Sequence, residues 1–155
     1  MGHHISAVVL NGSFNEDQAR LFDLKAMRLT PELTLFPLDA GFCDYWSEKL
    51  GVSGHKSRRP LLNSDVVHLM VDSIAENALF AVIETDYAGR GSQAAAVYRG
   101  ETEIMPPTVT GDGPIAESIG PINDALRHLG VVAREGRDEF DTLGLGQYRD
   151  FYDLF

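Results

Sequence analysis

Short apolar runs alternate with amphipathic segments along the chain, and this pattern predicts both strands and helices. Positions 5–10 and 33–38 are mainly apolar runs, which are typical of strands. The proline inside 33–38 favours a sheet edge or an early end for that strand. Between the two runs, Ser13 followed by Glu16 has the form of a capping box, and it predicts a helix that continues to about Arg28.

The centre of the chain carries the clearest strand pattern. Residues 80–99 predict two strands joined at a glycine-flanked arginine. Gly100 and Glu101 can then turn the chain into a third strand over 102–105, and the following two prolines are expected to end its pairing. The three strands predict an antiparallel β-meander at about 79–105.

Apolar stripes at helical spacing predict three further helices. One covers 44–50 and is closed by Gly51. Another is capped by Asn63 or Ser64, and a third covers 121–129 with proline at its first position. The apolar stripe of the middle helix consists of Val66, Val67, Met70, Val71, Ile74 and Ala75.

These elements predict an α+β fold, with a mixed or antiparallel sheet and helices packed mainly on one face. Since 155 residues suit one core and are short for two, residues 1–155 are expected to form a single domain. The segment 52–60, rich in Ser, Gly and basic residues, is expected to be a mobile loop. Residues 134–155 form an acidic tail that ends in aromatic residues.

An uneven negative charge narrows the choice of partners. The net charge is −10, and positions 60–126 hold ten acidic residues against only Arg90 and Arg99. Such a field repels phosphate backbones, so nucleic acid is not an expected partner, and it accelerates the approach of a basic protein. Solubility alone is the other explanation for this charge.

The cysteine content and the start of the chain predict the cellular compartment of the protein. Cys43 is the only cysteine, and beside Phe42 and Trp46 it is expected to be a small core residue. The N-terminus lacks the features of a secretory signal, and no apolar run has the length of a membrane span. These features predict a cytoplasmic protein without membrane association.

Polar side chains gather at the tip of the central hairpin. Glu84, Asp86 and Tyr87 lead into the tip, and Arg90 and Gln93 leave it. Together they can accept and donate hydrogen bonds and pair with an anion, which favours a small anion or carbonyl site or a contact loop for a partner. The alternative is an ordinary hairpin whose end is solvated.

Signatures of metal and nucleotide sites are weak. The glycine-flanked arginine is not followed by a helix or by the Lys-Ser or Lys-Thr pair of a phosphate loop. His68 and Asp72 form one helical pair and His128 and Asp124 another, and they would ligate a metal only if their polar faces met. Both faces are expected to point to solvent, so we predict no metal and no cofactor.

Aromatic residues recur at helical spacing at the C-terminus, and they must be buried somewhere. They either close the protein's own core or dock on another copy or another protein. The stripe consists of Tyr148, Phe151, Tyr152 and Phe155.

The leading functional hypothesis is a small, non-enzymatic protein-binding module. Its acidic surface and exposed aromatic residues would engage another, basic protein, as a toxin-neutralising immunity protein does, since complementary charge raises on-rate and specificity. Beside the hairpin residues, the hypothesis points to Asp44, Tyr45 and Trp46 as contact residues.

Two alternative hypotheses place the protein in other functional classes. One is a small hydrolase or transferase with Glu84, Asp86 or His68 as general base and Arg90 as the anion-stabilising group. The other is a small-ligand sensor with the hairpin as a wall of its pocket. A concave site with convergent polar groups would favour either of them over a flat binding surface.

Overall fold

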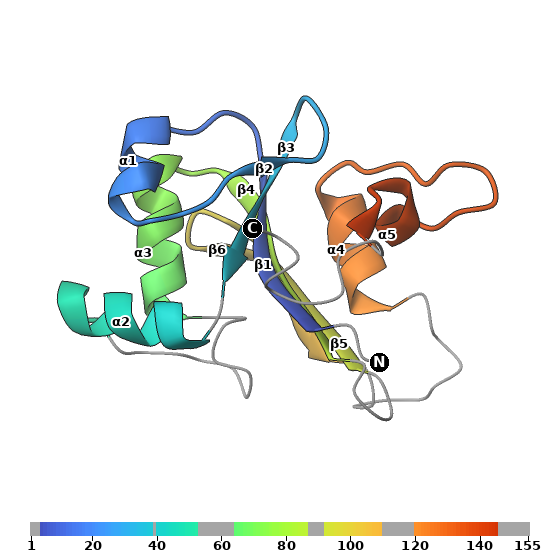
Figure 1. Cartoon of the computed structure of the whole chain (residues 1–155). Coiled ribbons are helices and arrows are strands. Elements are labelled where there is room, and N and C mark those ends of the chain that lie inside the picture. Colours follow the sequence, from blue (N-terminus) through green and yellow to red (C-terminus); the bar gives the residue numbers. More distant parts are fainter. Residues whose placement is uncertain (1–3, 39, 53–63, 87–91, 110–119, 146–155) are drawn as a thin grey trace.

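A single antiparallel sheet with helices on both faces forms the fold (Figure 1). The computed structural model describes residues 4–38, 40–52, 64–86, 92–109 and 120–145. Helices α1, α2 and α3 lie on one face of the sheet, and α4 and α5 lie on the other. The elements in chain order are β1 (His4–Asn11), α1 (Glu16–Leu21), β2 (Met27–Arg28), β3 (Leu33–Leu38), α2 (Ala40–Leu50), α3 (Asp65–Ile74), β4 (Leu79–Asp86), β5 (Ser92–Arg99), β6 (Thr102–Val109), α4 (Pro121–His128) and α5 (Glu139–Thr142).

The predicted α+β architecture is confirmed. The strand order is β2-β3-β1-β4-β5-β6, and consecutive pairing of β4, β5 and β6 forms the central meander. Gly100, with a φ of 57°, turns the chain between β5 and β6. Most helices pack on one face, as predicted, and α4 with α5 covers the opposite one.

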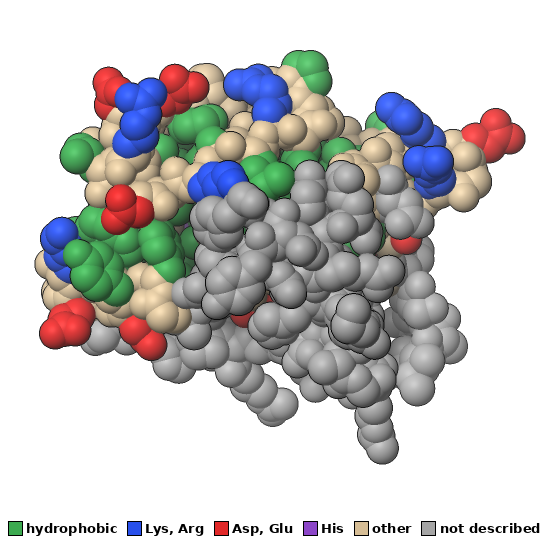
Figure 2. All heavy atoms as spheres, in the orientation of Figure 1, with side chains coloured by type: hydrophobic (Ala, Val, Ile, Leu, Met, Phe, Trp, Pro, Cys, Tyr) green, Lys and Arg blue, Asp and Glu red, His purple; other side chains and the backbone are tan. Residues whose placement is uncertain are grey.

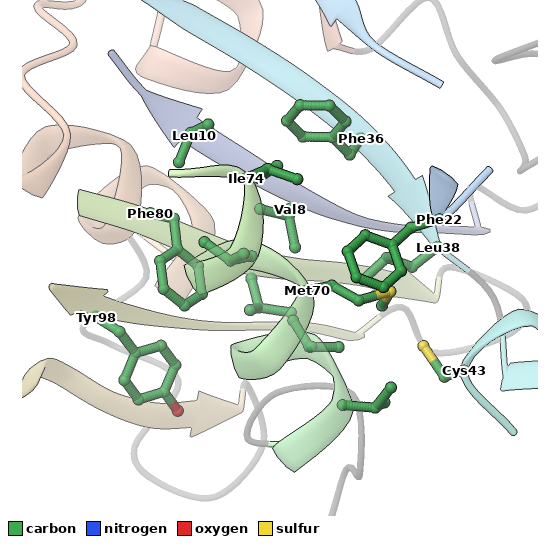
Figure 3. Packing of buried hydrophobic residues seen from close by; sticks show 14 of the residues in the cluster. Val8, Leu10, Phe22, Phe36, Leu38, Cys43, Met70, Ile74, Phe80 and Tyr98 are labelled. Atoms are coloured by element: carbon green, nitrogen blue, oxygen red, sulfur yellow. The ribbon is translucent and has the colours of Figure 1, made fainter. Parts of the chain in front are cut away.

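Burial on both faces explains the continuous apolar runs of the central strands. Successive side chains of a strand point to opposite faces. In β1, Ala7 and Val9 therefore join the hydrophobic cluster on the α4 side, and Val8 and Leu10 join the cluster under α3 (Figure 3). A strand covered on both faces needs apolar residues at successive positions, not at alternate ones.

The predicted helix from Ser13 to Arg28 is wrong at both ends. Asn15, not Ser13, caps α1, because its side-chain oxygen accepts a hydrogen bond from the backbone N–H of Gln18 at 3.0 Å. The helix ends at Leu21, and the left-handed backbone of Asp23 prevents its continuation. Met27 and Arg28 instead form the short strand β2.

The two sheet edges accommodate the prolines in different ways. On one edge, β2 pairs only with Thr34 and Leu35, so Pro37 lies beyond the end of β2. On the other edge, β6 continues through Pro106 and Pro107 to Val109, which corrects the predicted end of pairing. An edge strand tolerates proline because its outward N–H groups need no partner in the sheet.

The predicted helices over 44–50 and 121–129 are confirmed, the first starting earlier, at Ala40. Gly51 closes α2 with a φ of 71°, and Val52 donates to the carbonyl of Ser47 at 2.9 Å. Cys43 is buried in the core, as predicted. The predicted mobile loop over 52–60, except for Val52, and residues 146–155 of the tail lie outside the described residues.

Candidate functional site

The hairpin residues singled out in the sequence do not converge where the structure describes them. Glu84 pairs across the sheet with Ala94 and lies on the α3 side, where it is buried. Gln93 pairs with Thr85 and lies on the α4 side. The Asp86 side chain and residues 87–91, with Tyr87 and Arg90, lie outside the described part of the chain.

The side chain of Gln93 caps the start of α4. Its side-chain Oε1 accepts a hydrogen bond from the backbone N–H of Ile122 at 2.9 Å, and so satisfies one of the free donors at the start of α4. A Cβ on Gly120 would lie 2.7 Å from the same oxygen. Close packing of Gly120 on Gln93 thus fixes the entry into α4.

The residues predicted on α2 divide between core and surface. Trp46 is buried and packs edge-on against Phe22, with 5.2 Å between the two ring centres. Tyr45 is 55% exposed, Asp44 is exposed as well, and the ammonium of Lys49 lies 5.0 Å from the Trp46 ring centre. In Figure 2, hydrophobic side chains gather at the side of the molecule that carries α1 and α2, with acidic and basic side chains around them. Exposed Tyr45 gives this surface one residue of a type that is enriched at protein–protein interfaces.

A groove lies between α3 and the β5–β6 end of the sheet. Its volume is about 710 Å³. Four exposed carboxylates, Asp65, Asp72, Glu101 and Glu103, line it, and none of its described lining residues is Lys or Arg. The other described residues of its wall are Val52, His68, Leu69, Val71, Ser73, Ala75, Ala78, Phe80, Tyr98 and Gly100. We call this site the acidic groove.

Aromatic rings form the floor of the acidic groove. Phe80 and Tyr98 project from neighbouring strands toward α3 (Figure 3) and are buried. The imidazole of His68 packs edge-on against both rings, 4.5 Å from the centre of Tyr98 and 5.6 Å from that of Phe80. His68 and Asp72 were expected on a solvated face. Asp72 is exposed, whereas the imidazole of His68 is half-buried because it packs on the rings of Phe80 and Tyr98.

Burial, and secondly the nearby carboxylate of Glu103, raise the pKa of the Tyr98 hydroxyl well above its ordinary value of about 10. Both causes act against the phenolate, the first because a charge loses hydration and the second because like charges repel. Tyr98 therefore stays neutral at physiological pH and keeps its proton as a donor.

His68 of α3 and Glu84 lie at different positions along β4. His68 contacts Phe80, and Glu84 lies four residues farther along β4, which is roughly 13 Å for an extended strand. The two helical His–Asp pairs are also separated, since α3 and α4 lie on opposite faces of the sheet. No group of three or more potential metal ligands occurs among the described residues.

The sequence pointed to the charge of the acidic groove but not to its location. Ten acidic residues between positions 60 and 126 were apparent, and four of them converge here. Their convergence depends on the packing of α3 over β4 and β5, which places Asp72 near the distant turn that carries Glu101. His68 and Tyr98 were separated by thirty positions, and no local spacing connects them.

Comparison with known proteins gives no relative for this chain. No protein-family model matches it, and neither a curated protein nor a solved structure does. In the described residues, no helix combines the length and the apolar character that crossing a membrane would require.

Proposed function

We propose that the chain is a non-enzymatic protein-binding module that engages a basic partner through the acidic groove. The observation that carries this proposal is the groove itself, a hollow of about 710 Å³ whose charged side chains are all carboxylates among the described lining residues. A stoichiometric inhibitor of a basic protein is one specific form of such a module.

The acidic groove suits Lys and Arg side chains in both charge and shape. Asp72 comes from α3, and Glu101 and Glu103 come from the turn and strand opposite, so a cation between them meets carboxylates from two elements. The half-buried His68 and the apolar wall residue Leu69 offer contact to the aliphatic stem of a long basic side chain. Charge of one sign in a hollow also accelerates the approach of a partner of opposite sign.

Recognition by side chains is favoured over addition of a strand to the sheet. The open edge at β6 has shifted registers at Ala95–Val97 and at Val97–Tyr98, and it contains Pro106 and Pro107. Bulges and prolines are the means by which edges resist pairing with another chain. The partner is therefore expected to place side chains into the groove and not to extend the sheet.

The test is titration of the protein with an octalysine peptide, followed by calorimetry at two salt concentrations. The double variant Asp72→Lys/Glu103→Lys changes the groove, and Glu32→Lys/Glu135→Lys makes the same change of net charge at exposed positions outside it. We expect the groove variant to weaken binding at least about tenfold more than the control, and to reduce the salt dependence more.

Circular dichroism of both variants verifies that they are folded before affinities are compared. Equal weakening by the two variants would mean that the peptide responds to net charge alone, and would contradict a role for the groove. Octaglutamate serves as the negative probe and should not bind the wild-type protein.

A further inference from the structure

One titratable group in the acidic groove differs from the others in the pH at which it changes charge. The described lining residues with titratable side chains are the four carboxylates, the phenol of Tyr98 and the imidazole of His68. Histidine is the only one of these residue types whose ordinary pKa, about 6.5, lies between pH 5.5 and pH 8. The raised pKa of Tyr98 keeps its hydroxyl neutral throughout this range. Among the described lining residues, His68 is therefore the one expected to change its charge near neutral pH.

The sheet beneath His68 holds the imidazole ring and adds no charge close to it. The ring packs edge-on against Phe80 and Tyr98. On β4, Glu84 lies four residues beyond Phe80, or roughly 13 Å along an extended strand. On β5, Arg99 follows Tyr98 and so projects to the opposite face of the sheet. The charges that act on the imidazole therefore come from the walls of the groove.

Those walls carry carboxylates from two sides of His68. Asp65 precedes it by three positions and Asp72 follows it by four, so both lie on the same face of α3 as the imidazole. Glu101 and Glu103 come from the turn and the strand opposite. Neither α1 nor α2 contributes a charged residue to the described lining. A cation held by these carboxylates therefore shares the hollow with the imidazole.

Protonation of His68 and binding of a basic side chain in the same hollow oppose each other. An imidazolium offsets one of the four negative charges and repels an ammonium or guanidinium group bound among them. Salt screens this repulsion less at a partly buried site than at an exposed one. By linkage, a cation that binds better to the neutral imidazole also lowers the affinity of the imidazole for its proton. The affinity for a basic partner should therefore fall as the pH decreases through the pKa of the imidazole.

We propose that His68 makes the acidic groove pH-sensitive, so that the groove binds a basic partner more tightly at neutral pH than under mildly acidic conditions. The inference rests on the proposed function, because it concerns the affinity of that same groove for cations. Carboxylates ordinarily lose their charge near pH 4, so a groove lined by carboxylates alone would keep its partner down to a much lower pH. The imidazole moves this response toward neutrality.

Calorimetric titration with an N-acetylated octalysine peptide at pH 8 and at pH 5.5, at constant ionic strength, tests this proposal. Acetylation removes the α-amino group of the peptide, which would itself titrate in this range. We expect the Kd of the wild-type protein to rise at least about threefold from pH 8 to pH 5.5. His68→Gln should remove most of this rise, because glutamine is polar but does not titrate. His128→Gln, at an exposed position of α4 on the opposite face of the sheet, should keep the full rise.

The same Kd at both pH values would overturn the proposal and leave the binding role of the groove intact. An equal rise in His68→Gln and in the wild type would assign the pH dependence to another group and overturn it as well. Absence of binding at both pH values would instead contradict the proposed function, and the inference would fall with it. If His68→Gln does not fold, the imidazole resonances of the wild type are titrated by NMR with and without the peptide. The peptide should lower the pKa of His68, and an unchanged pKa would count against the proposal.

Discussion

Helices α3 and α4 lie on opposite faces of the same sheet but are held in different ways. Side-chain hydrogen bonds tie both ends of α4, from Ile122 to Gln93 and from Asn11 to Leu129. The N-cap of α3, Ser64, makes no such bond with its helix, and the acidic groove separates the outer side of α3 from the turn between β5 and β6.

The difference bears on the proposed binding surface. One polar side chain of α4 is used within the fold: Asn123 donates to Asp138 at 3.1 Å and accepts from the Phe140 N–H at 2.9 Å. The carboxylates around α3 stay exposed on the walls of a hollow. Under the proposed function, α4 serves stability and α3 serves recognition, and four measurements can contradict this division.

The largest expected effect comes from truncating matched leucines on the two helices. Leu126 of α4 is fully buried, so Leu126→Ala should lower the free energy of unfolding by about 2–5 kcal/mol. Leu69 of α3 lines the groove and is half-buried, so Leu69→Ala should cost less than about 2 kcal/mol. Urea denaturation measures the free energy of unfolding of both variants. Equal losses of this free energy would show that the groove side is packed as tightly as the α4 side.

A pair of glycines isolates the contact that fixes the start of α4. Gly120 and Gly136 have similar φ values, 83° and 77°, so alanine at either position should cost about 1–2 kcal/mol in backbone strain. A Cβ would meet Gln93 at 2.7 Å only at Gly120. In chemical denaturation, Gly120→Ala should therefore lower the free energy of unfolding by about 1–3 kcal/mol more than Gly136→Ala does. The same loss in both variants would mean that Gln93 moves aside without cost.

A pH titration examines the floor of the groove. Because the pKa of Tyr98 is raised, the folded protein keeps this proton at a pH where the unfolded chain has lost it. The free energy of unfolding should therefore fall as pH rises above about 10, by at most about 1.4 kcal/mol per pH unit from this group. Tyr98→Phe should remove that part of the fall between pH 9 and pH 11, whereas Tyr45→Phe, at an exposed ring, should not. An alkaline loss of the same size in Tyr98→Phe would contradict the burial of the hydroxyl.

Local chemistry made the meander and the two ends of α4 predictable. The turn at Gly100 and Glu101, the proline at the start of α4 and the glycine at its end act within a few residues of themselves, and so they are visible in the sequence. The end of α1 was missed because it depends on one left-handed residue, Asp23, inside a stretch of apolar residues at helical spacing.

Tertiary arrangement set the features that the sequence did not show. His68 shares a helical turn with Asp72, and this spacing suggests a polar face, but the position of Phe80 and Tyr98 beneath α3 decides that the imidazole is half-buried. The role of Gln93 depends likewise on a helix that begins nearly thirty residues later. Such side chains acquire their environment from long-range pairing, which a local pattern does not encode.

The smallest expected effect compares the caps of the two helices directly. Gln93→Ala removes the acceptor for the Ile122 N–H and should cost about 1 kcal/mol, with faster hydrogen exchange at the first turn of α4. Ser64→Ala removes no capping bond from α3 and should cost less than about 0.5 kcal/mol. Denaturation curves and amide exchange measure the two variants side by side. A loss in Ser64→Ala as large as that in Gln93→Ala would mean that α3 is anchored at its start as firmly as α4, and the contrast between the two helices would then rest on the groove alone.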